Sequence, residues 1–187
     1  TSARRSDFYN STLTGGTPSG TFYGCTLTGG TPSGTFYCCT LTDGSAGGTF
    51  CNCILRNKTA EQGTFDNCLL VGGVMSGLAN NCILNGTKVT YATLRACCTD
   101  DPKLTGWNMV YGDPGLVDAE NGDYRLQSDS PCRDAGITPL ALQVGIETDM
   151  EGSERYMGKS VDIGPYEYQP TNDHQTITAP IPVEFDW

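Results

Sequence analysis

Hydrophobic and polar positions in the first half of the chain follow a pattern that returns every 14 or 15 residues. In residues 21–28, Phe22, Cys25 and Leu27 fall on one face of an extended chain, and polar residues or Tyr fall on the other. A run of Gly, Pro and Ser follows, which is typical of a turn. A repeat this short, with the two-residue period of strands, predicts a parallel β-solenoid.

The repeat predicts rows of identical side chains inside the solenoid, one coil above the next. We call the cysteine row the cysteine ladder: Cys25, Cys39, Cys53, Cys68, Cys82 and Cys97. The aromatic row is Phe8, Phe22, Phe36, Phe50 and Phe65, and the leucine row is Leu13, Leu27, Leu41, Leu55, Leu70 and Leu84. A bend position, with left-handed backbone and an asparagine ladder, is expected at Asn10, Gly24, Cys38, Asn52, Asn67 and Asn81.

The repeat stops after Cys97 and Cys98, so we divide the chain into coils (1–100), a carboxy-terminal segment (101–170) and a Pro-rich tail (171–187). Early coils are nearly uniform and later coils are individual. Nothing before Phe8 has the pattern of a cap. An uncovered solenoid end exposes unpaired backbone groups, so either residues 1–6 or a partner is expected to cover it.

The carboxy-terminal segment contains five motifs in order: D-P-G-L-V-D (113–118), G-D-Y-R-L (122–126), S-P-C-R-D-A-G (130–136), D-M-E-G-S-E-R (149–155) and V-D-I-G-P-Y-E (161–167). This order resembles the closing module of the choice-of-anchor Q group of secreted parallel β-helix proteins. The resemblance implies a right-handed parallel β-helix, a capping role for residues 101–170 and an extracellular or cell-surface location. It implies no particular reaction. The coils are shorter than is usual in that group, and Cys132 and Pro165 depart from its pattern.

Ten cysteines are unusual for a protein of the reducing cytosol, and their even number favours disulfides and an oxidising compartment. The alternative is that the ladder cysteines are small buried apolar residues. Cys132 is a candidate to tie the cap to Cys97 or Cys98. The net charge of −10 is uneven, because residues 1–96 carry +2 and residues 97–187 carry −12. Such a chain is not expected to bind nucleic acid. No apolar run is long enough for a membrane span.

Candidate reactive groups are sparse. His174 is the single histidine, no G-x-S-x-G or C-x-x-C-H motif occurs, and Asp43 and Asp66 are isolated. The acidic residues of the carboxy-terminal motifs are expected to accept turn N–H groups and to pair with arginines. A calcium site at Asp149 and Glu151 is an alternative whose spacing does not match the usual loop. We expect no cofactor and no metal, and the sequence favours a protein that is not an enzyme without deciding the point.

Three further features bear on function. Asn10, Asn57 and Asn85 begin glycosylation sequons. The tail alternates apolar and other residues, which predicts an assembly arm that adds a strand to a neighbour, or a frayed end, over Ile177, Ile181, Val183, Phe185 and Trp187. A T-x-T pair recurs on three coils at Thr12–Thr14, Thr26–Thr28 and Thr40–Thr42. Such an array resembles ice-binding solenoids, although Thr is also the ordinary outward residue of a strand.

Together these patterns predict an extracellular structural protein that binds copies of itself head to tail, in filaments or a surface layer. The rival function is a cell-surface module that binds or cleaves polysaccharide. Ice binding is a further alternative.

Overall fold

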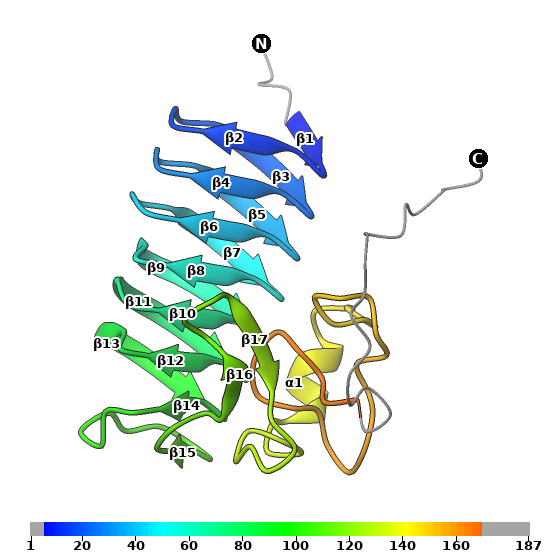
Figure 1. Cartoon of the computed structure of the whole chain (residues 1–187). Coiled ribbons are helices and arrows are strands. Elements are labelled where there is room, and N and C mark those ends of the chain that lie inside the picture. The colour runs from blue at the N-terminus through cyan, green and yellow to red at the C-terminus, as the bar shows by residue number, and fades with distance from the viewer. Residues whose placement is uncertain (1–5, 170–187) are drawn as a thin grey trace.

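The structure, a computed structural model, describes residues 6–169. Most of these residues form a stack of short parallel strands, and the rest pack beside the stack (Figure 1). Sheet A contains, in spatial order, β1 (Ser6–Tyr9), β3 (Ser19–Tyr23), β5 (Ser33–Tyr37), β7 (Gly47–Cys51), β9 (Thr59–Asp66), β11 (Val74–Asn80) and β13 (Lys88–Arg95). Sheet B contains β2 (Thr12–Thr14), β4 (Thr26–Thr28), β6 (Thr40–Thr42), β8 (Ile54–Arg56), β10 (Leu69–Val71), β12 (Ile83–Asn85), β14 (Cys98–Thr99) and β15 (Val110–Tyr111).

Each coil contributes one strand to each sheet, and neighbouring coils pair in parallel with matching residues opposite one another. Phe22 pairs with Phe36 in sheet A, and Leu27 pairs with Leu41 in sheet B. The sequence separation of paired residues is therefore the repeat length. The predicted all-β parallel solenoid with 14–15-residue coils is confirmed, while its right hand stays a prediction.

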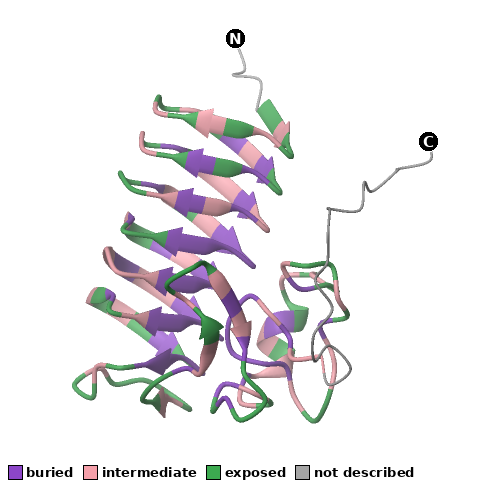
Figure 2. Ribbon diagram, viewed as in Figure 1, coloured by how far each residue is buried: buried purple, intermediate pink, exposed green. Residues whose placement is uncertain are grey.

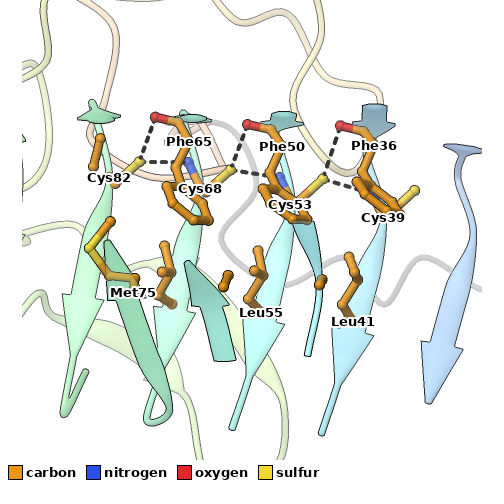
Figure 3. Close-up of a cluster of buried hydrophobic side chains, with 14 of the residues drawn as sticks. Phe36, Cys39, Leu41, Phe50, Cys53, Leu55, Phe65, Cys68, Met75 and Cys82 are labelled. Carbon is orange, nitrogen blue, oxygen red and sulfur yellow. Dashed lines mark hydrogen bonds between the residues drawn. The ribbon is translucent and has the colours of Figure 1, made fainter. Parts of the chain in front are cut away.

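The core lies between the two sheets and is built from the predicted rows. Neighbouring phenylalanine rings from Phe8 to Phe65 stack with centroids 4.6–5.1 Å apart and planes within 7°. The cysteine and leucine rows fill the remaining space (Figure 3), and buried positions run through the interior of the stack (Figure 2). Because each coil covers the apolar face of the next, no coil has a core of its own.

Left-handed residues turn the chain from sheet A to sheet B. Cys38, Asn52, Asn67 and Asn81 have φ between 51° and 53°, as the sequence predicts for this position. The Asn81 Nδ2 donates to Asn67 Oδ1 at 3.2 Å, which confirms the amide contact for this pair of coils.

Residues 113–169, which we call the lateral module, pack against the outer face of sheet B beside the later coils (Figure 1). The module contains the antiparallel pair β16 (Leu116–Asp118) and β17 (Asp123–Leu126) and the short helix α1 (Thr138–Leu142). The apolar part of its interface with the solenoid is formed by Ile54, Leu69, Ile83 and Cys98 from the coils and by Tyr124, Leu126, Cys132 and Ile163 from the module.

The sequence predicts that residues 101–170 close the solenoid as a capping module. Their first part packs against the core through Leu104 and Met109. The remainder lies alongside, because the outward residue of sheet B changes from Thr26 in the early coils to Leu69 in a later one. An apolar outward row needs a cover, and the module supplies it. No helix of the described residues is long and apolar enough to cross a membrane.

Candidate functional site

The amino end of the solenoid terminates in two strand edges. β1 and β2 are the outermost strands of their sheets, and no strand within residues 6–169 pairs with their outer edges. In the second coil the Thr26 N–H donates to Ser11 O, one coil back, at 2.9 Å. By the same geometry the N–H of Thr12 points away from the solenoid. An edge with open donors and acceptors is a template for another strand.

The side chains at this end continue the interior rows. Phe8 and Leu13 pack on the core but are only partly buried, whereas Phe22 is fully buried one coil further in. Tyr9 stacks on Tyr23 with ring centroids 4.9 Å apart and is 58% exposed. The described part of the first three coils carries few charged residues, and this end presents a partly apolar edge on which Asp7 of β1 is the charged side chain.

The opposite end of sheet A is also partly unpaired. Beyond β13, the Trp107 N–H donates to Leu94 O at 3.0 Å and the Ala96 N–H donates to Trp107 O at 2.8 Å. Residues 88–93 have no strand on their outer side within the described chain. Two exposed aromatic side chains lie at this end of the sheet: Tyr91 is fully exposed and Trp107 is 64% exposed.

The cysteine ladder lies inside the solenoid as predicted, and each thiol takes part in a repeated set of hydrogen bonds (Figure 3). The Cys53 thiol donates to Phe36 O at 3.3 Å, and its sulfur accepts the N–H of Cys39 at 3.5 Å. Burial, followed by hydrogen bonds with the two neighbouring cysteines, raises the pKa of Cys68 well above its ordinary value. All ten cysteines are free thiols in the structure, so disulfides stay a prediction.

The two candidate partners of Cys132 point in opposite directions. Cys97 faces the solenoid core, where its thiol approaches Ala79 O at 3.5 Å. Cys98 faces outward into the interface with the lateral module, where it joins the same buried cluster as Cys132.

The T-x-T pairs form two rows on the outer face of sheet B in the first three coils. Thr12 pairs with Thr26 and Thr26 with Thr40, and the row two residues further on repeats this register. The rows lie on coils that precede the apolar positions bound by the lateral module. The array stops at Ile54, as the sequence predicts.

The remaining predicted residues are scattered. Asn10 and Asn57 are exposed, whereas Asn85 is half-buried at the rim of a cavity. The proposed arm from Ile177 to Trp187 lies outside the described residues.

A buried charged cluster inside the lateral module is the main feature that the sequence did not single out. Arg155 is fully buried, and its Nη2 donates to Asp162 O at 3.2 Å and to Gly164 O at 2.5 Å. The Glu167 Oε2 lies 4.0 Å from Arg155 Nε and accepts the N–H of Asp162 at 3.0 Å. Burial, and then the nearby Asp162, raises the pKa of Glu167 to about 8.

The carboxylates around this arginine hold backbone turns together. Asp149 Oδ1 accepts the N–H groups of Glu151 and Ser153 at 2.8 and 2.9 Å, as the sequence predicts for this motif. The described residues contain no group of three or more side chains suited to hold a metal ion. Asp149 thus holds together the turn that follows it, as the hydrogen bonds to Glu151 and Ser153 show.

Lys58, like Arg155, is a buried charged residue that donates hydrogen bonds to backbone carbonyls. Lys58 is only 3% exposed, although it lies in a charged turn between β8 and β9. Its ammonium group donates to the carbonyls of Gly29 and Asp43 in the two preceding coils. Burial lowers the pKa of Lys58 from its ordinary value. The lysine thus satisfies turn carbonyls that converge at one corner.

A cavity of about 410 Å³ lies between the last coils and the lateral module. Its polar lining includes Asn85, Asp100 and Asp113. Asp100 Oδ1 accepts the Gly86 N–H at 3.2 Å, and Asp113 Oδ1 accepts the Gly115 N–H at 2.9 Å. Both carboxylates keep a second oxygen that can accept a hydrogen bond from a ligand.

Comparison of the chain with protein-family models, with curated proteins and with solved structures finds no match.

Proposed function

We propose that the protein is an extracellular structural protein that associates with copies of itself through the open ends of its solenoid. The observation that carries this proposal is the unpaired outer edge of β1 and β2, where the interior rows end at half-buried Phe8 and Leu13. Each coil inside the molecule gains its core from the coil before it. A second copy would supply the missing neighbour of the first coil.

A head-to-tail arrangement is favoured by strand direction. All strands of sheet A are parallel, so the β13 edge of one copy and the β1 edge of the next can pair in the same sense as the strands within a copy. The exposed aromatic residues Tyr9 and Tyr91 lie at the two edges that would meet. Repetition of a heterologous contact produces filaments unless a ring closes.

The proposed location rests on the sequence. The five carboxy-terminal motifs resemble those of the choice-of-anchor Q group, whose members are secreted parallel β-helix proteins. An assembly of stacked solenoids outside the cell would serve as a fibre or a surface layer.

The test removes one outward donor without breaking a bond inside the chain. In Thr12→Pro the N–H that points away from the first coil is lost, whereas Thr12→Val keeps that N–H in a side chain of similar shape. We expect wild-type protein and Thr12→Val to form filaments with rising concentration, and Thr12→Pro to sediment as a monomer. Analytical ultracentrifugation and negative-stain microscopy give the readouts.

Deletion of residues 177–187 tests the predicted arm separately, since filaments lost in this variant alone would assign the contact to the tail. Wild-type protein that stays monomeric at millimolar concentration would contradict the proposed self-association.

The alternative is carbohydrate binding, which the cavity at Asp100 and Asp113 favours. It predicts that a neutral oligosaccharide binds the monomer, that calorimetry detects the binding, and that Asp100→Asn together with Asp113→Asn weakens it at least tenfold.

A further inference from the structure

Cys98 and Cys132 are brought together by the docking of the lateral module on the solenoid. Cys98 follows the ladder residue Cys97, and successive residues of a strand face opposite sides of the sheet. Cys97 therefore points into the core and Cys98 points out of sheet B. Both Cys98 and Cys132 have no exposed surface.

Backbone contacts fix the position of Cys132 independently of its thiol. The Ile163 N–H donates to Cys132 O at 2.9 Å, and the Gly164 N–H donates to Asn81 O at 2.9 Å, in the coil that precedes Cys98. Gly164 lies so close to Ile83 that an added Cβ would be 2.7 Å from Ile83 Cδ1. Ile83 is the direct strand partner of Cys98. The chain around Cys132 is thus held against the strand that carries Cys98.

The two thiols interact with each other. A hydrogen bond between them lowers the pKa of Cys98 and raises the pKa of Cys132.

The ladder cysteines differ from this pair. Each of the inner ones donates its S–H to a phenylalanine carbonyl and accepts an N–H from the neighbouring coil, as Cys53 and Cys68 show at 3.2–3.5 Å. A disulfide between two ladder residues would remove these bonds from both coils.

We propose that Cys98 and Cys132 form a disulfide that fastens the lateral module to the solenoid, while the cysteine ladder stays reduced. This inference does not depend on the proposed self-association.

The oxidant is a disulfide of a small thiol, such as oxidised glutathione. The Cys98 thiolate attacks one glutathione sulfur and releases a glutathione thiolate. Cys132 gives its proton to solvent, and its thiolate then attacks the Cys98 sulfur and releases the second glutathione thiolate. Two protein thiols are oxidised by two electrons, and one disulfide is reduced to two thiols. Because both sulfurs are buried in the docked state, the exchange takes place before the module docks.

Peptide mapping of the full chain tests the pairing. Protein refolded with reduced and oxidised glutathione is alkylated in denaturant and digested with trypsin without reduction. We expect residues 96–103 to be linked to residues 126–133, and alkylation of all cysteines except two. Fragmentation between Cys97 and Cys98 assigns the linked sulfur in wild-type protein.

Two serine variants give the matched comparison. Cys97→Ser should retain the link and Cys98→Ser should lose it. Proteolysis within the lateral module should be at least tenfold slower in oxidised than in reduced wild-type protein, and equal in the two states of Cys98→Ser. A link through Cys97, a disulfide between ladder residues, or ten free thiols after oxidation would each overturn the proposal.

Discussion

Glycines at one position of the coil set how closely successive turns of the backbone approach. An added Cβ at Gly34 would lie 1.9 Å from Gly20 O, and one at Gly48 would lie 1.9 Å from Gly34 O. Both glycines have positive φ, 135° and 129°. The contact partner is backbone, which cannot rotate out of the way. The repeated S-G-T and G-G-T sequences at this position therefore have a steric cause.

A pair of neighbouring substitutions measures this effect. Gly48→Ala should lower the free energy of unfolding by about 2–4 kcal/mol, because it adds a clash to a strained backbone. Gly47→Ala is the control, since nothing lies within 4 Å of its added Cβ and its φ is not in the left-handed range. It should change stability by no more than about 1 kcal/mol. Urea unfolding followed by circular dichroism compares them, and equal losses would refute the steric explanation.

The raised pKa of Glu167 makes the stability of the lateral module depend on pH. Its value is about 8 in the folded protein and 4.5 ordinarily, so between these values the folded state holds a proton that the unfolded chain has lost. The stabilisation is complete below pH 4.5 and is lost as pH rises through 8. We expect the free energy of unfolding to fall by about 2 kcal/mol over this window through Glu167, after allowance for solvent screening.

Glu167→Gln should flatten this pH dependence, because glutamine stays neutral at every pH. The exposed Glu154→Gln removes the same charge from the same module and should leave the slope unchanged. Thermal unfolding at pH 5, 6, 7 and 8 provides the measurement. An unaltered slope in Glu167→Gln would assign the dependence to other buried acids, such as Asp66, whose pKa burial raises to about 6.

At the scale of the strand, one outward position of sheet B decides whether a coil is covered. Thr26 is exposed at this position, and Leu69 is fully buried under the lateral module. Leu69→Thr places the early-coil residue in a later coil. We expect it to lower the free energy of unfolding by about 2–3 kcal/mol and to speed amide hydrogen exchange in residues 113–169.

Thr26→Val is the control at the uncovered position and should stay within about 0.5 kcal/mol of wild type. Loss of protection throughout the coils in Leu69→Thr, instead of in the module first, would contradict independent docking of the module.

The strands of the coils could be predicted because identical residues recur in phase, and each coil repeats the environment of the last. Phe22, Cys25 and Leu27 recur every 14 residues, so they show the repeat length, the face that points inward and the pairing of strands between coils. The position of the lateral module could not be derived in the same way. Its contacts join Ile54 or Ile83 to residues about 70–80 positions later, with no period to relate them. The change from Thr26 and Thr40 to Ile54, Leu69 and Ile83 was a usable signal, since it marks outward positions that need a cover.

The buried cluster was missed for a related reason. Arg155 and Glu167 look like surface charges in a polar, acidic segment, and their spacing resembles turn chemistry. Their burial depends on contacts with residues that are distant in the sequence, such as the Glu167 N–H bond to Asp149. The local sequence therefore predicts the turns, but it does not predict the tertiary contacts that bury Arg155 and Glu167.

The whole molecule divides along its axis into an uncovered part and a covered part. The outward strand positions of the first three coils are mostly Thr, Ser and Tyr, and the later coils carry the lateral module (Figure 2). The uncovered part has a repeated, nearly uniform surface. The covered part contains most of the acidic residues, the buried Arg155 cluster and the cavity. Association at the ends and any ligand at the cavity would therefore act on separate regions of one protein.

Residues 15–28 and 29–42 differ only at Gly24 and Cys38, so the number of coils in the solenoid can change without other changes in sequence. Strand pairing joins each of these coils only to its two neighbours, so removal or duplication of one 14-residue unit leaves the remaining strands paired with strands of nearly the same sequence. A gene that encodes such units can gain or lose one by recombination between the copies. The free part of the solenoid would then shorten or lengthen in steps of about 4.8 Å, while the module and its docking site stay unchanged.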